Sequence, residues 1–293
     1  MFIFDDIILF LRANFDNKHY SILSFSYSVL MVITQIGLAA LYGLNGVATG
    51  RYLAVGLSMI LGLILLRNTG FFEVKTILPT KKTIFEMIRF GVVILLTNSV
   101  SYVMQLNETF ILGAILKDEV ALADYRVASY ILVISTFIVQ SVAVFIYPYF
   151  TKYMNDKKWV WKNFKKLTII NIAVMTPIHI ALIIFSPIFI IVVFGQQYIN
   201  AVPIMQMLLI ASFGQTTLRM LTGNVLLAIG EEKFNLKINL VFMILHVIID
   251  IWAVINFGIY GAAIALGFVY YLSGLIMILH LRKVCHNEEK VML

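Results

Sequence analysis

The stretch FGVVILLTNSVSYVMQLNETFILGAIL, residues 90–116, decides the fold class of this chain. Its apolar run from Phe90 to Leu112 is long enough to cross the hydrocarbon of a membrane as a helix, which takes about 20 residues. The polar side chains inside the run recur at offsets of three, four and three residues, which is one face of a helix: Asn98, Ser101, Gln105 and Glu108. The stretch therefore predicts a transmembrane helix with one polar face.

Apolar stretches of the same kind recur along the whole chain. The sequence is 61% hydrophobic and 13% charged, whereas a soluble domain has about a quarter of its residues charged, so too little polar surface remains to coat a soluble globule. We expect an all-α, polytopic membrane helical bundle of about eight transmembrane helices. The predicted spans are Ser21–Tyr42, Val47–Leu66, Phe90–Leu112, Arg126–Tyr149, Leu167–Phe185, Ala201–Ile229, Ile238–Ile255 and Ile259–Leu281.

Lys and Arg residues gather in alternate breaks between these spans. They precede the first span and follow the second, fourth, sixth and eighth, whereas 43–46, 186–200 and 256–258 carry no charged residue. Because cytoplasmic loops are enriched in Lys and Arg, we expect a multi-pass protein of the cytoplasmic (inner) membrane with both termini in the cytosol. The net charge of +7 is then explained by the Lys and Arg residues of the cytosolic loops, which set the orientation in the membrane. We therefore expect no nucleic-acid partner.

The breaks also suggest a division of the chain into segments. A retained cytosolic segment, 1–20, precedes two helices in 21–66, and a cytosolic linker, 67–89, leads to six helices in 90–281 and a cytosolic tail, 282–293. The linker's stretch TKKTIFEMIR, residues 80–89, is amphipathic and predicts a helix lying along the inner leaflet, where anionic lipids attract lysines. Pro177 predicts a kink, and residues 188–194 form an apolar run too short to cross, which we expect at the interface.

Polar faces on five spans predict a hydrated cavity or a network between helices. For any single Asn, Gln, Ser or Thr residue, an interhelical hydrogen bond is the preferred explanation. Arg219, Glu108 and Asp250 are different, because an unpaired charge costs at least about 2.5 kcal/mol at the centre of a membrane helix. His246 lies one turn before Asp250, which predicts a structural contact or a proton relay. The candidate cavity residues are Arg219, Glu108, Asp250, His246, Gln105, Asn98, Gln140, His179 and Gln215.

Catalytic and metal chemistry find little support. Cys285 is the only cysteine, which excludes an intrachain disulfide and a cysteine cluster, and the chain has no GxxxxGK phosphate-binding loop. We therefore expect no enzyme activity, no cofactor and no metal site.

Several motifs in the second half resemble the oligosaccharide flippases of the Wzx type, which belong to the multidrug/oligosaccharidyl-lipid/polysaccharide exporter superfamily. The matching residues, in order, are Phe90-Gly91, Glu108, Ile111-Leu112-Gly113, Tyr125 with Ala128, Pro148, the segment FGQQYINAVPIMQML at 194–208 and NFGIYGAAIA at 256–265. One departure is that Glu108 stands where the family usually has aspartate. The other is that family members have two six-helix lobes, so the resemblance implies that 21–66 is part of an incomplete N-terminal lobe lacking four helices and that 90–281 is the C-terminal lobe.

The resemblance implies that the protein moves an undecaprenyl-diphosphate-linked oligosaccharide across the membrane for O-antigen or capsule assembly. The implied partners are the lipid-linked oligosaccharide, membrane lipids and a polysaccharide polymerase, and Arg219 suits the diphosphate because guanidinium binds phosphate with two hydrogen bonds. Two other interpretations stay open, namely a multidrug or small-molecule cation antiporter of the same superfamily and a non-functional truncated remnant of a flippase.

Overall fold

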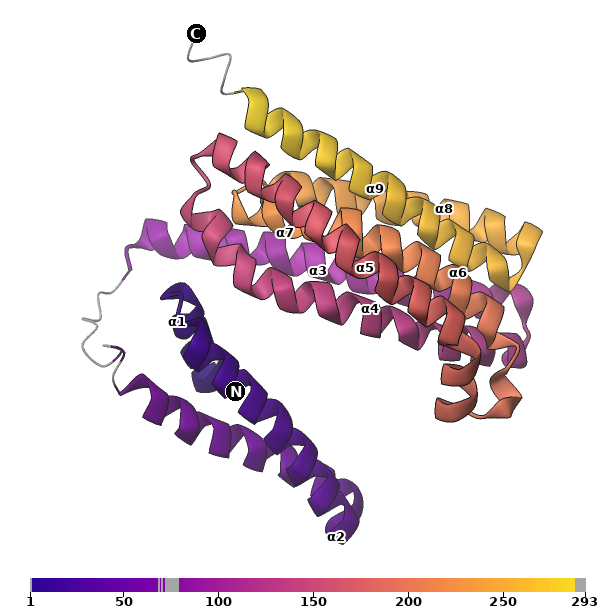
Figure 1. Ribbon diagram of the computed structural model, residues 1–293, viewed down its shortest axis with the longest axis horizontal. Coiled ribbons are helices and arrows are strands. Elements are labelled where there is room, and N and C mark those ends of the chain that lie inside the picture. Colours follow the sequence, from indigo (N-terminus) through magenta and orange to yellow (C-terminus); the bar gives the residue numbers. More distant parts are fainter. Residues whose placement is uncertain (1, 68, 70, 72–78, 288–293) are drawn as a thin grey trace. The chain divides into compact units, whose positions relative to one another are not determined.

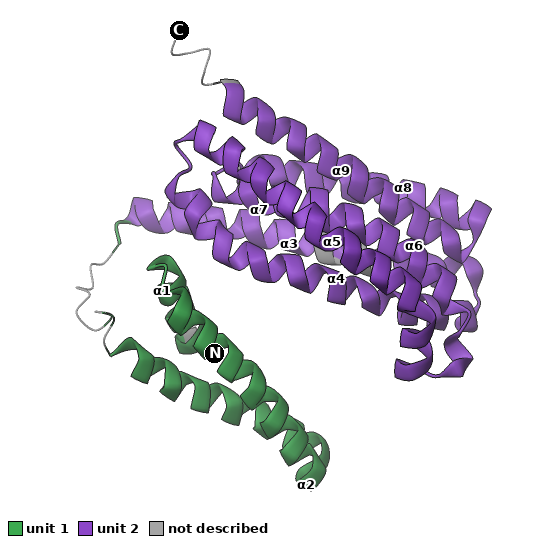
Figure 2. Ribbon diagram, viewed as in Figure 1, with its two compact units in different colours: residues 1–80 green, residues 81–293 purple. Residues whose placement is uncertain are grey.

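The computed structural model describes residues 2–67, 69, 71 and 79–287, without the side chains of 2, 100–102, 104–106 and 287. The described chain forms two compact units, 1–80 and 81–293, which are coloured separately in Figure 2. The helices, labelled in Figure 1, are α1 (Phe2–Ala13), α2 (Asn17–Leu66), α3 (Lys81–Leu116), α4 (Glu119–Lys152), α5 (Lys157–Val193), α6 (Ala201–Gly214), α7 (Met220–Ala228), α8 (Glu232–Phe257) and α9 (Ile259–Asn287). A 3-10 turn, η2 (Gln196–Tyr198), precedes α6, and a π-helical segment, η3 (Gln215–Arg219), joins α6 to α7.

The first unit is built around a hairpin within α2. The helix reverses at Gly43, whose φ of +57° and ψ of −137° are non-helical, so α2 contains the first two predicted spans. Its second half buries a small residue at every fourth position, namely Gly46, Gly50, Ala54, Ser58 and Gly62. A Cβ on Gly50 would lie 2.7 Å from the Thr34 carbonyl oxygen across the hairpin. Small residues therefore let the two halves of α2 approach closely, as in other membrane helix pairs.

The predicted N-terminal segment 1–20 is mostly helical and is packed on this hairpin. Phe4, Ile7 and Leu11 of α1 form a buried apolar cluster with Leu23 and Leu66 of α2. The chain turns after α1 and begins α2 at an N-cap, where Asp16 accepts hydrogen bonds from the backbone N–H and the imidazole of His19. The helix α1 is thus an integral part of the first unit.

The second unit is a bundle of long helices that run alongside one another in Figure 1.

Two expectations about its segments are wrong in detail. The amphipathic stretch 80–89 is not a separate surface helix, because α3 begins at Lys81 and continues without a break to Leu116. The unit boundary falls within the predicted linker 67–89, of which 72–78 lies outside the described residues, as does 288–293 of the tail.

The second correction concerns α5, which does not end near Phe185 but continues through Pro177 and Pro187 to Val193. A proline within a helix leaves the carbonyl four residues earlier without its usual donor. For Pro187 that carbonyl belongs to Ile183, and it accepts hydrogen bonds from the Ser186 hydroxyl at 2.7 Å and the Gln206 amide at 3.3 Å. Residues 188–193 are therefore the last residues of α5 and not a separate segment, and their place at the membrane interface stays a prediction.

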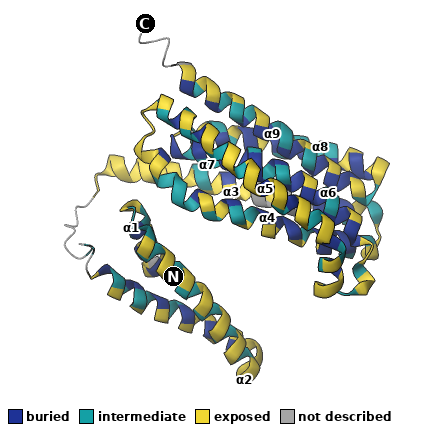
Figure 3. Ribbon diagram, in the orientation of Figure 1, coloured by how far each residue is buried: buried dark blue, intermediate teal, exposed yellow. Residues whose placement is uncertain are grey.

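The described helices contain all eight predicted spans. By length and composition alone, six helical segments could each cross a membrane, namely α2, α4, α5, the continuous helix α6–η3–α7, α8 and α9. The first of these contains two predicted spans, and α3 contains the third. Figure 3 colours the exposed residues of these helices yellow. Many of them carry large apolar side chains, which fits surfaces that face lipid. The all-α, polytopic fold class is confirmed.

Candidate functional site

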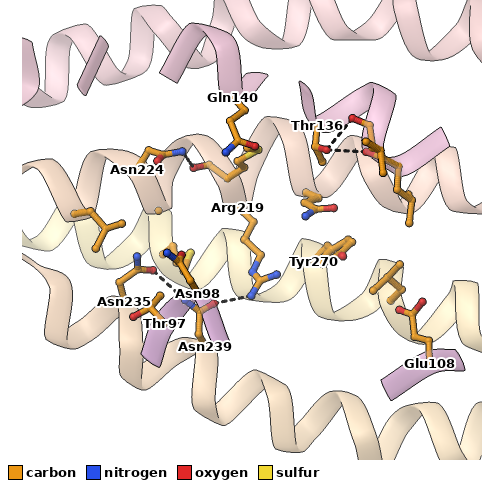
Figure 4. Close-up of a pocket in the computed structure, with 18 residues that line it drawn as sticks. Thr97, Asn98, Glu108, Thr136, Gln140, Arg219, Asn224, Asn235, Asn239 and Tyr270 are labelled. Atoms are coloured by element: carbon orange, nitrogen blue, oxygen red, sulfur yellow. Dashed lines mark hydrogen bonds between the residues drawn. The ribbon is translucent and has the colours of Figure 1, made fainter. Parts of the chain in front are cut away.

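The second unit contains a cavity of about 500 Å³. Residues from α3, α4, η3, α7, α8 and α9 surround it, and Figure 4 shows them. Polar side chains make up most of the lining, namely Thr97, Asn98, Glu108, Thr136, Gln140, Gln215, Arg219, Asn224, Asn235, Asn239 and Tyr270, and the rest is Leu132, Val133, Met220, Gly223, Leu227, Leu266 and Met277. Among the described lining residues, Arg219 is the one cation and Glu108 the one acid.

Arg219 lies at the end of the π-helical segment, well inside the continuous helix α6–η3–α7, which is long enough to cross a membrane. Its side chain is 9% exposed. The Nη2 group donates a hydrogen bond to the Asn239 side-chain oxygen at 2.6 Å, and the guanidinium carbon lies 5.4 Å from the ring centre of Tyr270. These contacts are visible in Figure 4. An amide acceptor and an aromatic ring both stabilise a guanidinium, so α8 and α9 fix its position in the cavity.

Hydrogen bonds from side chains stabilise the π-helical segment. The hydroxyls of Thr216 and Thr217 donate to the carbonyls of Ser212 and Phe213, and the Asn171 amide on α5 donates to the Thr216 carbonyl at 2.9 Å. A π segment widens the helix by one residue per turn and leaves carbonyls that need other donors. The polar residues of α5 and η3 supply such donors, and the segment sets the direction of Arg219.

Glu108 lines the cavity at a different place from Arg219, as Figure 4 shows. The hydroxyl of Tyr125 on α4 donates to Glu108 Oε2 at 2.6 Å. On the other side, Nε2 of His246 on α8 lies 3.5 Å from Glu108 Oε1. This acid is therefore surrounded by α4 and α8, and among the described residues it forms no ion pair with Arg219.

The predicted candidate residues divide between the cavity lining and the helix packing behind it. Five of them line the cavity: Arg219, Glu108, Asn98, Gln140 and Gln215. The side chain of Gln105 lies outside the described part of the chain. The remaining three, His179, His246 and Asp250, are buried but do not line the cavity.

The assignment of His179 to the cavity is corrected by its contacts. Its Nε2 lies 3.0 Å from the Ser212 hydroxyl, its Nδ1 lies 2.9 Å from the Met175 carbonyl, and its ring packs edge-on against Phe213. All of these contacts are to α5 and α6. The polar face of α5 therefore packs α5 against α6 and the π-helical segment.

The expected contact between His246 and Asp250 is not a hydrogen bond. Both side chains are fully buried on the same face of α8. In the described part of the chain, neither imidazole nitrogen and neither carboxylate oxygen of this pair has a hydrogen-bond partner. The spacing of one turn correctly predicts that His246 and Asp250 share one face of α8. The imidazole of His246, however, approaches Glu108 of α3.

Sequence reasoning missed several residues of the lining. Asn239 belongs to a polar face that the sequence shows, but it is not among the predicted cavity residues. In the structure, its side-chain oxygen accepts the hydrogen bond from Arg219. Asn235 was placed before the start of its span. Tyr270 and Asn224 gave no periodic signal, because single polar residues in apolar helices are common.

Comparisons with known structures agree with this architecture. A crystal structure of a MATE transporter in complex with MaL6 has a TM-score of 0.87 and 14% sequence identity, over 98% of this chain and 67% of that chain. A MOP superfamily transporter from Pyrococcus furiosus, for which the reverse polarity of the binding pocket suggests a different function, has a TM-score of 0.78 and 13% identity, over 91% of this chain and 62% of that chain. The chain is thus a helical membrane protein with the MATE transporter fold.

The family follows from the sequence comparison. Residues 7–203 match the family described as polysaccharide biosynthesis protein, and the chain belongs to this family. An uncharacterized membrane protein of Methanocaldococcus jannaschii is 28% identical over 173 residues, which is 57% of this chain and 34% of that protein. The chain therefore spans about a third of the length of this curated relative.

Proposed function

We propose that the chain belongs to a flippase that moves an undecaprenyl-diphosphate-linked oligosaccharide from the inner to the outer leaflet of the cytoplasmic membrane, for O-antigen or capsule assembly. The polysaccharide biosynthesis family and the MATE transporter fold support a transporter in such a pathway. The specific cargo is inferred from the chemistry of the cavity. Membrane lipids and a polysaccharide polymerase remain the other expected partners.

The observation that carries the proposal is the buried Arg219 in the cavity wall. A guanidinium has five N–H donors in a planar fork and pairs with phosphate through two parallel hydrogen bonds. Asn239 and Tyr270 hold this group in place. A buried cation in the cavity wall favours an anionic cargo such as a diphosphate and disfavours a cationic one.

The rest of the lining suits a carbohydrate. Six side-chain amides face the cavity, namely Asn98, Gln140, Gln215, Asn224, Asn235 and Asn239. Each amide has both donors and acceptors, which match the hydroxyl groups of a sugar. The volume of about 500 Å³ lies within the usual range of small-ligand sites, about 300 to 1,000 Å³.

A cation antiporter of the multidrug type is the second candidate, and Glu108 is the observation that favours it. This acid lines the same cavity and could hold a lipophilic cation or a proton. The two candidates differ in the sign of the cargo. A flippase should depend on Arg219, whereas a cation antiporter should depend on Glu108 and tolerate loss of Arg219.

The test measures surface polysaccharide and membrane abundance in cells that produce variants of the whole protein. Arg219→Lys keeps the charge but loses the two-pronged geometry, so we expect normal abundance with strongly reduced surface polysaccharide. If Arg219 only stabilises the fold through Asn239 and Tyr270, Arg219→Lys and Arg219→Ala should both lower abundance. Normal surface polysaccharide and normal abundance in Arg219→Ala would contradict the proposal.

A further inference from the structure

The turn between α4 and α5 and the first turns of α5 carry a dense group of positive charges. Residues 152–166 contain six lysines and one aspartate, a net charge of +5. The aspartate, Asp156, is the N-cap of α5, and its side chain accepts a hydrogen bond from the backbone N–H of Trp159 at 2.9 Å. The cavity lining described above contains none of these residues. This charge is therefore not used in the proposed recognition of a diphosphate by Arg219.

Four of these lysines share one face of α5, and we name them the lysine stripe: Lys158, Lys162, Lys165 and Lys166. All four side chains are exposed. Lys162 lies four residues from both Lys158 and Lys166, a spacing at which like charges on a helix repel each other. Among the described residues, Lys162, Lys165 and Lys166 form no ion pair with an acidic side chain. An anionic ligand would therefore stabilise this face of α5.

Aromatic rings lie beside the lysine stripe. Two of the chain's three tryptophans belong to these turns, and both are partly buried. The ring of Trp159 stacks on Tyr153 at 4.5 Å, and the ring of Trp161 meets His286 of α9 edge-on at 5.7 Å. Lys165 Nζ lies 5.7 Å from the ring centre of Trp161, which is within the range of a cation–π contact. The rings thus form an ordered base, packed on α4 and α9, next to the positive charges.

The length of α5 places the stripe at the level of lipid headgroups. The helix has 37 residues and is therefore about 55 Å long, whereas the hydrocarbon of a membrane is about 30 Å thick. The apolar run of α5 begins at Leu167, directly after Lys166. Tryptophan is the residue that favours the boundary between hydrocarbon and water. The stripe and its rings therefore face the layer in which phosphate groups of lipids lie.

We propose that the lysine stripe and Trp161 form a binding site for the headgroups of anionic phospholipids. The ammonium groups of the lysines donate hydrogen bonds to phosphate oxygens, and the indole ring contacts the less polar part of the lipid below them. At the adjacent end of α9, Arg282 and Lys283 are also exposed and add to the positive potential. The site lies outside the cavity and binds lipid whether or not the protein carries a cargo.

The experiment is native mass spectrometry of the purified chain with added phosphatidylglycerol, which gives the association constant of the first lipid bound. The double variant Lys162→Gln/Lys166→Gln should lower this constant by about fivefold for each lysine removed. The double variant Lys233→Gln/Lys237→Gln is the matched control. It removes two exposed lysines with the same spacing on α8, where two glutamates directly precede them, and it should leave the constant unchanged. Equal losses in the two double variants would overturn the proposal.

Two measurements on the unmodified chain keep the proposal falsifiable if a variant folds poorly. Phosphatidylcholine, which has no net charge, should bind more weakly than phosphatidylglycerol, and added sodium chloride should reduce the difference because salt screens exposed charges. Equal association constants for the two lipids at low salt would overturn the proposal. Tighter binding of soluble polyglutamate than of phosphatidylglycerol would also overturn it, because the partner of the stripe would then be an acidic protein surface.

Discussion

Replacing Gly274 of α9 by alanine should destabilise the second unit through the π-helical segment. A Cβ at this position would lie 2.7 Å from Leu218 Cβ and 3.0 Å from the backbone nitrogen of Arg219. Carbon atoms are in favourable contact at about 3.5–4.0 Å, so the backbone that carries Arg219 would have to move. Gly267 on the same helix provides a matched control, because its Cβ would meet Ala211 Cβ at an ordinary 3.4 Å.

The magnitude follows from two opposing effects. Overpacking costs about 1–3 kcal/mol, and alanine is favoured over glycine in a helix by about 1 kcal/mol. The second effect is common to both variants and cancels in their difference. We therefore expect Gly274→Ala to lower the free energy of unfolding by about 1–3 kcal/mol relative to Gly267→Ala.

Reversible unfolding of the chain by sodium dodecyl sulfate in mixed micelles measures this difference. Arg219 lies next to the displaced atoms, so Gly274→Ala should also weaken the binding of a polyprenyl diphosphate, and Gly267→Ala should not. Equal unfolding free energies for the two variants would refute the reasoning, since they would show that α9 can move away from the π-helical segment at no cost.

Three other predictions concern the rest of the chain. Topology reporters fused at Lys158 and within η2 should report opposite sides of the membrane, and the same side for both would refute the predicted orientation. In the α2 hairpin, a Cβ on Gly46 would overlap a carbonyl oxygen of the opposite half, whereas a Cβ on Gly37 meets nothing within 4 Å. Gly46→Ala should therefore reduce membrane abundance, and Gly37→Ala should not. Equal abundance of the two variants would contradict the close approach of the two halves of the hairpin. The hydrogen bond from His19 lowers the pKa of Asp16 below its usual value of 3.8. The N-cap of α2 therefore contributes its full stability above pH 3.8 and loses it as the pH falls through the lowered pKa of the folded state. A carbon-13 titration of the Asp16 carboxyl that gave a pKa of 3.8 or higher would contradict this.

The spans and the polar faces could be predicted because lipid enforces them. A polar side chain in a membrane helix must face the interior of the bundle, so the faces of the third, fourth and sixth spans pointed to Asn98, Glu108, Gln140, Gln215 and Arg219, which line one cavity. The same rule cannot separate a cavity wall from a packed interface. His179 follows the same periodicity and is engaged with Ser212 instead.

Features that depend on contacts distant in sequence could not be predicted. The π-helical segment depends on Asn171 of α5 reaching the Thr216 carbonyl, 45 residues later. The continuation of α5 past Pro187 depends on Gln206 of α6, which donates to the Ile183 carbonyl. Local sequence shows the proline but does not show the distant donor that compensates for it.

The central claim is that Arg219 recognises a diphosphate in the cavity, and the binding of farnesyl diphosphate to the purified chain in nanodiscs tests it most directly. Losing one of two hydrogen bonds to a charged group costs about 1.5–3 kcal/mol, so Arg219→Lys should weaken binding by about tenfold to 100-fold. Arg126→Lys, the same change at an exposed arginine of α4, should leave the affinity unchanged. Equal affinities for the unmodified chain and Arg219→Lys would contradict the account.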